Sequence, residues 1–198
     1  MAIRFYQMVY VIFVYLLSSI PFSLLVAKSL SGTDIREYGD KNPGAYNAWR
    51  YGSKAAGVFG FSLDFLKGGL AVFAAKKIWP DSELILLLTA LSAVSGHAWS
   101  FYLHFNGGKA LAVTAGVFLF LFKGFVALVW FLLFGFLRVL GVPTPKSVVI
   151  TLFTANIQTF VSYRSWYLRS AVFLVSLIVT YKHKKALFSN QKEAYLDT

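Results

Sequence analysis

The sequence predicts an all-α, polytopic integral membrane protein, and three observations support that class. Of its 198 residues, 58% are hydrophobic and only 14% are charged, whereas about a quarter of the residues in soluble domains are charged. The mean hydropathy is +0.64. Apolar stretches close to the roughly 20 residues that a membrane span requires recur along the chain. A disordered chain, a coiled coil and an ordinary soluble globule are therefore excluded.

Six apolar stretches follow one another between polar or basic segments. They cover Phe5–Ala27, Ala55–Ala75, Leu84–Phe105, Leu111–Leu137, Ser147–Val161 and Trp166–Tyr181. A polar segment, 28–54, follows the first stretch, and a basic tail, 182–198, follows the last. Since no repeat is visible, we expect one transmembrane helical domain over residues 1–198.

The fourth stretch decides the number of spans, because Lys123 and Gly124 interrupt it. One long tilted helix over 111–137 gives six spans, and two short helices give seven. Lys and Arg concentrate in the cytoplasmic loops of membrane proteins. Seven spans place twelve of these residues inside and six outside, whereas six spans place eight inside and nine outside. The charges thus predict seven transmembrane helices, some short, with the N-terminus outside and the C-terminus cytoplasmic.

The same topology gathers the polar chemistry on the cytoplasmic side. It places the segment 28–54, the loops 106–109 and 138–147 and the end of the last helix on one face. The net charge of +11 then fits basic loops that face anionic lipid in an inner or plasma membrane. No basic stripe lies on a soluble face, so nucleic acid is not an expected partner. With no Cys and only eight Asp and Glu residues, we expect neither a metal nor a cofactor.

The densest polar motif ends at Arg50. Within it, Asn42, Gly44 and Asn47 are turn formers or amide donors, and glycine lets the backbone approach a ligand closely. Arg50 carries a forked cation that binds phosphate bidentately. A solvated basic loop explains the same residues equally well.

A second motif, Asn106-Gly-Gly-Lys109, precedes the fourth apolar stretch. Free N–H groups at Gly107 and Gly108, the positive end of a helix and the Lys109 ammonium favour an anion site. The spacing is not that of a Walker A loop. A flexible turn between two helices is the alternative interpretation.

Several polar side chains fall within or beside apolar stretches. A buried His in a membrane, such as His97, is often functional, but a hydrogen bond to a neighbouring helix explains it as well. His183, at the end of the last stretch, fits interfacial anchoring as well as catalysis. Ser19 and Ser147 are more typical of helix–helix hydrogen bonds.

One acid and one base in the second stretch have a structural interpretation. Asp64 and Lys67 are three residues apart, so they are expected to pair on one helix face.

Together these motifs resemble the bacterial acyl-phosphate:glycerol-3-phosphate acyltransferase family, over about residues 8–188. That family has seven transmembrane helices and three cytoplasmic motif regions. The regions correspond to Ser18–Lys28, Asp34–Gly39, Asn42–Asn47, Arg50 and Asp64–Gly68; to Gly96-His97 and Phe105–Lys109; and to Lys146-Ser147 and Tyr181–His183.

The chain departs from the family pattern at several positions. Asp40 and Lys41 stand where the family has Ser-Gly, and Ala110 stands where it has Gly. The other departures are Tyr46 in place of Thr, Asn106 in place of Lys, and Ala186 in place of Asn, with Asn190 one helical turn further on. These differences indicate a divergent member.

The resemblance implies transfer of a fatty acyl group from acyl-phosphate to the 1-hydroxyl of glycerol-3-phosphate. The products are lysophosphatidic acid and phosphate, in the first step of phospholipid biosynthesis. The expected partners are these substrates and membrane lipids, with no protein partner. A membrane transporter of phosphate or a phosphate ester would use the same basic motifs and is the alternative, although no internal repeat supports it.

The resemblance also implies roles for individual residues. Catalytic roles fall to Lys109, Arg50, His97, His183 and Ser147, and substrate or phosphate contacts fall to Ser19, Lys41, Asn42, Gly44, Asn47, Gly107 and Gly108. No His is followed five residues later by Asp, so the general-base motif of acyl-CoA-dependent glycerolipid acyltransferases is missing. A histidine or the substrate phosphate could accept the hydroxyl proton.

Overall fold

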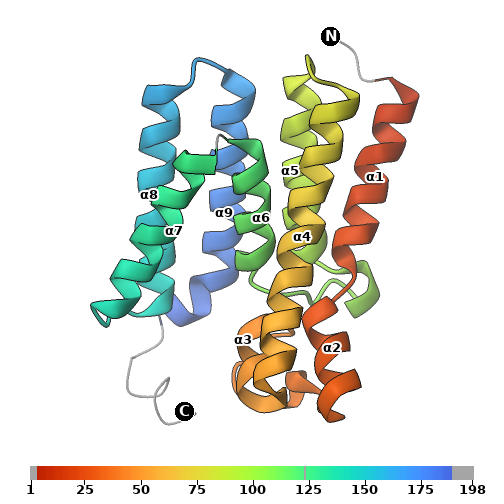
Figure 1. Cartoon of the computed structure of the whole chain (residues 1–198), viewed down its shortest axis with the longest axis vertical. Coiled ribbons are helices and arrows are strands. Elements are labelled where there is room, and N and C mark those ends of the chain that lie inside the picture. Colours follow the sequence, from red (N-terminus) through yellow and green to blue (C-terminus); the bar gives the residue numbers. More distant parts are fainter. Residues whose placement is uncertain (1–3, 123, 189–198) are drawn as a thin grey trace.

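The computed structural model describes residues 4–122 and 124–188, and every regular element in these ranges is helical. Lys123 of the predicted interruption, and Asn190 and Lys192 of the predicted tail, lie outside the described residues. The helices are α1 (Phe5–Ser19), α2 (Phe22–Ser31), α3 (Ala45–Asn47), α4 (Lys54–Ile78), α5 (Glu83–Ala98), α6 (Leu111–Leu121), α7 (Gly124–Val139), α8 (Thr144–Ser162) and α9 (Trp166–Phe188). The longer helices form an upright bundle, and α2 and α3 extend beyond its lower end (Figure 1).

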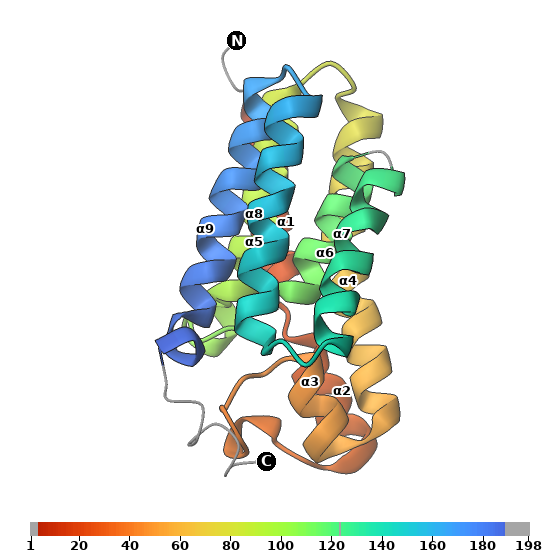
Figure 2. The same ribbon diagram turned by 90° about the vertical axis from the view of Figure 1, so that its left-hand side faces the viewer.

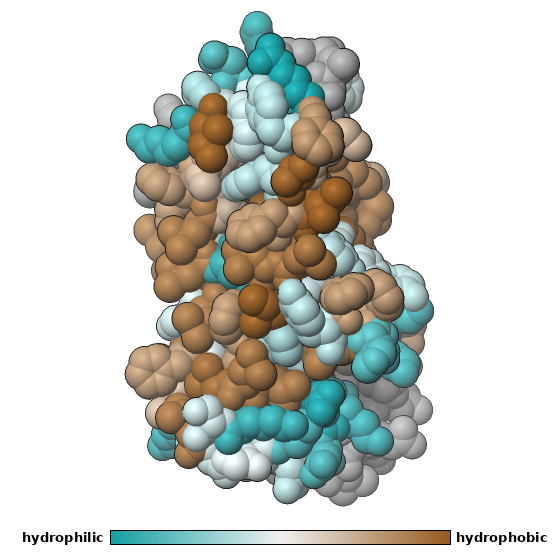
Figure 3. All heavy atoms as spheres, turned by 90° about the vertical axis from the view of Figure 1, so that its right-hand side faces the viewer, coloured by the Kyte–Doolittle hydropathy of each residue, from teal (hydrophilic) through white to brown (hydrophobic). Residues whose placement is uncertain are grey.

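Three helical stretches in the described part of the chain are long and apolar enough to cross a membrane. They are Phe5–Ser31, Lys54–Ile78 and Glu83–Leu103, and two shorter apolar helices cover Leu111–Leu121 and Val126–Val139. Apolar surface dominates the middle of the face shown in Figure 3, with polar surface at both ends. The predicted all-α membrane class is confirmed, while seven spans and their orientation stay a prediction.

The first apolar stretch, expected over Phe5–Ala27, lies within the candidate span Phe5–Ser31, which is built from two helices, α1 and α2. Pro21 has no N–H to donate and its ring disfavours a helical residue before it, and α1 ends with Ile20 in an extended conformation. Lys67 Nζ donates to the Ile20 carbonyl (2.8 Å), and Ser100 Oγ donates to the Ser19 carbonyl (2.5 Å). Side chains from other elements thus satisfy the carbonyls that the break exposes.

The fourth stretch is also two helices, α6 and α7, so the alternative of a single long helix is excluded. The ammonium of Lys76 donates to the Leu121 carbonyl (2.7 Å) at the end of α6, where a cation stabilises the helix dipole. Helix α7 then returns beside α6. The α7–α8 loop therefore lies at the same end of the bundle as α3 and the end of α9 (Figure 1 and Figure 2).

Two other predicted boundaries differ. The third stretch was expected to run to Phe105, but α5 ends at Ala98 and a short 3-10 turn, Phe101–Leu103, follows. His104 and Phe105 have positive φ values of 49° and 63°, which end any regular helix. Helix α9 continues past the predicted limit at residue 181 to Phe188.

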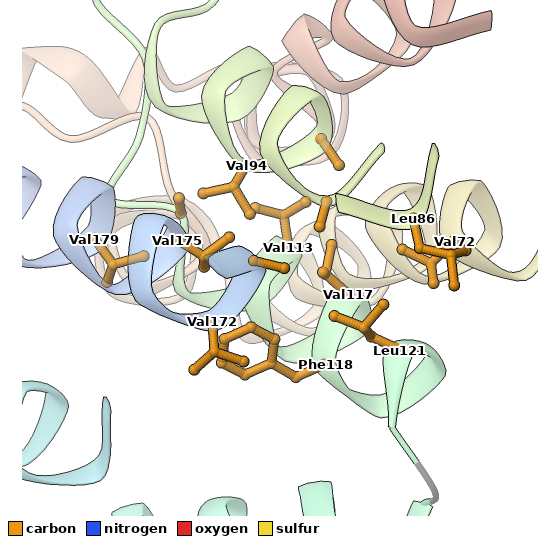
Figure 4. Close-up of a cluster of buried hydrophobic side chains, with 14 of the residues drawn as sticks. Val72, Leu86, Val94, Val113, Val117, Phe118, Leu121, Val172, Val175 and Val179 are labelled. Atoms are coloured by element: carbon orange, nitrogen blue, oxygen red, sulfur yellow. The ribbon is translucent and has the colours of Figure 1, made fainter. Parts of the chain in front are cut away.

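Valines and other aliphatic residues of α4, α5, α6 and α9 meet in the core (Figure 4). Helices α4 and α6 approach closely where small residues face each other. A Cβ built on Gly116 would collide with the Phe65 carbonyl, and one on Gly68 would lie 2.6 Å from the Val113 carbonyl. Small residues are the usual means by which membrane helices pack closely, and this packing fixes the start of α6 beside α4.

Candidate active site

The motifs singled out in the sequence gather at the lower end of the bundle, where the chain path places the segment 32–53, the loop 99–110 and the end of α9 (Figure 1). The predicted gathering of polar segments at one end is confirmed.

The Gly107-Gly108 turn packs directly on the end of α5. The Gly108 N–H donates to the His97 carbonyl (3.0 Å). A Cβ on Gly107 would collide with that carbonyl, and a Cβ on Gly108 would collide with His97 Nε2. Only glycine fits at either position, because the backbone itself lies against the histidine. Lys182 of α9 reaches the same place and donates to the carbonyls of Ala98 (2.7 Å) and Gly107 (3.3 Å).

A small pocket, too narrow in this conformation to hold a water molecule, lies between this turn and the α1–α2 break. Its lining includes Ser19, His97, Gly107 and Gly108, together with Ser100. Four predicted site residues from three separate segments therefore meet around one space.

A buried polar cluster lies beneath this pocket. Asp64 pairs with Lys67 (2.7 Å), as predicted, and accepts a hydrogen bond from Ser23 Oγ (2.6 Å). Its Oδ1 is also 3.5 Å from His97 Nδ1. With Nδ1 turned toward a carboxylate, the Nε2 atom of His97 is the nitrogen left near Gly108. At 3.5 Å no hydrogen bond joins the carboxylate to the imidazole, so the carboxylate acts on the imidazole through its charge.

A second polar cluster, more exposed, joins two loops. Lys109 Nζ lies 2.6 Å from Asp40 Oδ2. Asn47 Nδ2 donates to Asp40 Oδ1 (2.9 Å) and to the Asn42 carbonyl (3.0 Å), and the Asn42 N–H donates to Asp40 Oδ1 (3.2 Å). Gly44 is the N-cap of α3, where an added Cβ would lie 2.8 Å from Asn42 Nδ2. The structure thus brings Asn42, Asn47 and Lys109 together around Asp40.

The charge of Asp40 depends on this environment. Burial raises the pKa of the carboxyl. The Lys109 ammonium and the two N–H donors lower it by a larger amount, so the pKa of Asp40 lies below its usual value. Asp40 is therefore ionised at neutral pH.

Two of the predicted cations lie at the surface of the polar segment. Arg50 is exposed, donates to the Tyr46 hydroxyl (3.2 Å) and lies 5.6 Å from the centre of the Tyr51 ring. Lys41 is exposed and has a φ of +59°, in the left-handed region that favours glycine.

His183 and Ser147 are buried on the two C-terminal helices. His183 Nδ1 lies 2.8 Å from the Val179 carbonyl, and its Nε2 has no hydrogen-bond partner among the described residues. The charges of Lys109 and Asp40 both act on this imidazole. Ser147 Oγ donates to the Val142 carbonyl (3.1 Å), in the loop just before its own helix, so the structure does not join Ser147 to the pocket.

Sequence reasoning missed several polar contacts of the site. Asp40 stood out only as a departure from the family pattern, and Lys182 only as part of the Tyr181–His183 motif region and as a basic charge, with no contact predicted for it. Ser23 lies within the Ser18–Lys28 motif region but had no predicted partner, and Ser100 carried no signal, because the partners of both come from distant segments. For Lys182, its place beside His183 at the end of the last stretch was the available signal.

The fold and this site define a class: a helical membrane protein with a basic, glycine-lined polar site at one end. Comparison with known proteins makes this specific. A family model described as glycerol-3-phosphate acyltransferase matches residues 8–189. The chain belongs to that family.

Curated relatives carry the same description. A glycerol-3-phosphate acyltransferase of Bordetella petrii is 33% identical over 178 residues, which cover 86% of this chain and 82% of the relative. One from Legionella pneumophila (strain Corby) is also 33% identical over 86% of this chain, but the match covers 61% of the relative. One from Wolbachia pipientis is 44% identical over 103 residues, so the match spans about half of each protein (52% and 53%).

Solved structures agree in fold. The glycerol 3-phosphate form of PlsY, an integral membrane glycerol 3-phosphate acyltransferase, superposes with a TM-score of 0.85 and 31% identity, over 92% of this chain and 90% of that one. Its lysophosphatidic acid form gives a TM-score of 0.80 and 29% identity over the same shares. This chain is accordingly an all-helical integral membrane protein.

Proposed function

We propose that this chain transfers a fatty acyl group from acyl-phosphate to the 1-hydroxyl of glycerol-3-phosphate. The products are lysophosphatidic acid and phosphate. The observation that carries the proposal is the Gly107-Gly108-Lys109 turn seated against His97, in a chain that aligns over 92% of its length with the glycerol 3-phosphate form of PlsY.

The reaction needs binding groups for anions more than it needs an enzyme nucleophile. The hydroxyl oxygen attacks the acyl carbonyl carbon, the bond from that carbon to the phosphate oxygen breaks, and phosphate leaves with the electron pair. Phosphate is a good leaving group, so positioning and charge neutralisation supply most of the catalysis. Lys109, Arg50 and Lys41 are the proposed cations, and the N–H group of Gly107 is the proposed backbone donor. The N–H of Gly108, expected from the sequence to be free, donates instead to the His97 carbonyl, so Gly108 contributes by bringing the turn against His97.

Smaller polar groups complete the proposed site. Asn42, Asn47 and Ser19 supply neutral hydrogen-bonding groups, and Gly44 allows the loop to approach the ligand. Ser147 and His183 are proposed contacts from the C-terminal helices.

His97 is the proposed acceptor of the hydroxyl proton. Asp64, 3.5 Å from its Nδ1, supports a tautomer whose Nε2 is unprotonated and lies near Gly108 beside the pocket. A buried carboxylate behind an imidazole also stabilises the imidazolium that forms when the proton arrives. The carboxylate is itself held by Lys67 and Ser23.

We further propose that residues 1–198 act as one transmembrane domain without a protein partner. In this proposal seven spans place the N-terminus outside and the site on the cytoplasmic face of the cell inner membrane. A C-terminal reporter is expected to be accessible only from the cytoplasmic side. Access only from outside would contradict the topology.

The activity is tested with purified protein in detergent and labelled glycerol-3-phosphate. One reaction receives palmitoyl-phosphate and another palmitoyl-CoA, and lysophosphatidic acid is measured in both. We expect turnover with the acyl-phosphate alone. Turnover with palmitoyl-CoA alone would contradict the proposed donor. If folded protein forms no lysophosphatidic acid with either donor, the proposed activity is contradicted. A transporter would then be favoured, and its transport would be assayed in sealed vesicles.

A further inference from the structure

Asp40 is an internal anion held by the groups proposed to bind phosphate. Its Oδ2 lies 2.6 Å from Lys109 Nζ, and its Oδ1 accepts hydrogen bonds from Asn47 Nδ2 and the Asn42 N–H. An ammonium and two N–H donors that converge on one anionic group also describe a binding site for a phosphate oxygen. The carboxylate thus occupies a position suited to the ligand.

The pair is open to exchange. The side chains of Asp40 and Lys109 are 45% and 30% exposed, so a soluble phosphate ester can reach both. Water solvates both partners of an exposed ion pair well, so such a pair contributes little to stability. Lys109 can therefore leave Asp40 for a phosphate without unfolding the loops.

We propose that Asp40 is a competitor for Lys109 built into the chain, and that it lowers the affinity of the site for glycerol-3-phosphate and for inorganic phosphate. A bound phosphate has to displace the carboxylate from the ammonium, and it then lies beside a like charge. The reaction releases phosphate into the same site, so Asp40 also limits inhibition by this product. The identity of the ligands rests on the proposed function, whereas the competition requires only that Lys109 bind phosphate.

The substitution Asp40→Asn removes the charge and keeps the shape. Binding of inorganic phosphate and of glycerol-3-phosphate is measured by calorimetry on the purified full chain in detergent. We expect both dissociation constants to fall on the order of fivefold, the size of one exposed charge interaction. In the acyl-transfer assay we expect a similar fall in the KM for glycerol-3-phosphate and in the inhibition constant of phosphate, with no rise in kcat.

Asp34→Asn is the matched control. Asp34 lies in the same segment, accepts a hydrogen bond from the N–H two residues further on (Arg36, 3.1 Å), and pairs with a lysine (Lys28, 2.9 Å). We expect phosphate binding to stay at the wild-type value in this variant. Asp40→Glu, which restores the charge, is expected to bind phosphate like the wild type.

Asp40→Ser provides a second neutral variant. Unchanged or weaker phosphate binding by folded Asp40→Asn or Asp40→Ser protein would overturn the proposal, and would leave Asp40 as a residue that only positions Lys109. Tighter phosphate binding by Asp34→Asn as well would also overturn the proposal, because the loss of any acidic side chain in this segment would then tighten binding. The proposed function fails separately, if wild-type protein forms no lysophosphatidic acid, because the phosphate titration needs no turnover.

Discussion

Two lysine–aspartate pairs at the same end of the bundle have nearly the same length and opposite surroundings. Lys67 and Asp64 lie 2.7 Å apart, with side chains 2% and 1% exposed. Lys109 and Asp40 lie 2.6 Å apart, with side chains 30% and 45% exposed. The first pair joins two turns of one helix, whereas the second joins two loops.

The difference separates a pair that holds the site from a pair that exchanges with substrate. Removing one partner of a buried pair leaves an uncompensated charge, which is strongly destabilising. An exposed pair contributes at most about 1 kcal/mol, so its cation is available to a ligand. The buried pair also contacts His97 and the carbonyl of Ile20 at the α1–α2 break, and thus fixes the walls of the pocket.

The largest effect is expected for Asp64→Asn. This change leaves the buried Lys67 ammonium without its counter-charge, and we expect a loss of about 3–5 kcal/mol in the free energy of unfolding. Thermal unfolding in detergent measures it, with Asp40→Asn, whose carboxylate is 45% exposed, as the exposed control. Adding Lys67→Met to Asp64→Asn is expected to restore part of the loss. Equal melting temperatures for Asp64→Asn and the control would refute the structural role of the buried pair.

The next effect is expected for Lys109→Ala, which tests the exposed pair. We expect kcat/KM to fall by about 10²–10³, as for the loss of one strong donor to a developing anion, with an unchanged melting temperature. Lys28→Ala is the matched control, because it leaves Asp34 without its lysine but lies outside the proposed site. Near-wild-type turnover in Lys109→Ala would remove the lysine from the proposed phosphate site.

The two pairs also differ in how far the sequence predicts them. Spacing along one helix predicts the contact of Asp64 with Lys67, because residues three apart share a face. Nothing in the linear sequence places Asp40 beside Lys109, since the chain crosses the bundle between them. Local pairs follow from periodicity, and pairs between loops follow only from the tertiary fold.

The fold shows a similar division. Hydropathy predicts the apolar stretches, and the distribution of Lys and Arg predicts the separation of α6 from α7. Hydropathy does not predict the end of α5 at Ala98, because Trp99–Phe105 is as apolar as a helix and turns through backbone conformation alone. Pro21 was visible within the first stretch, and its missing N–H was the signal for the break that averaged hydropathy conceals.

A smaller effect is expected at Lys41, within the loop that presents Asp40. Its φ of +59° costs an L-residue roughly 1–2 kcal/mol, and glycine regains most of this less the entropy it loses on folding. We expect Lys41→Gly to stabilise the protein by about 0.5–1 kcal/mol, and Lys41→Ala to leave stability unchanged, both by thermal unfolding. Equal stability of the two variants would show that the loop relaxes and carries no strain.

The smallest effect is the pH dependence of the exposed pair. The native pKa of Asp40 lies below its usual value, so the pair stabilises the fold above the unfolded pKa of about 3.9, and this stabilisation is lost as the pH falls through the native pKa. Because Asp40 is half exposed, we expect the loss to be less than about 1 kcal/mol. The contribution of the pair is measured as the difference in unfolding free energy between wild type and Asp40→Asn, from pH 7 down to pH 3. The titration of other carboxylates cancels in this difference. A difference that shrinks on acidification supports a weak, exchangeable pair. A difference of several kcal/mol would place Asp40–Lys109 with the buried pair and contradict exchange with phosphate.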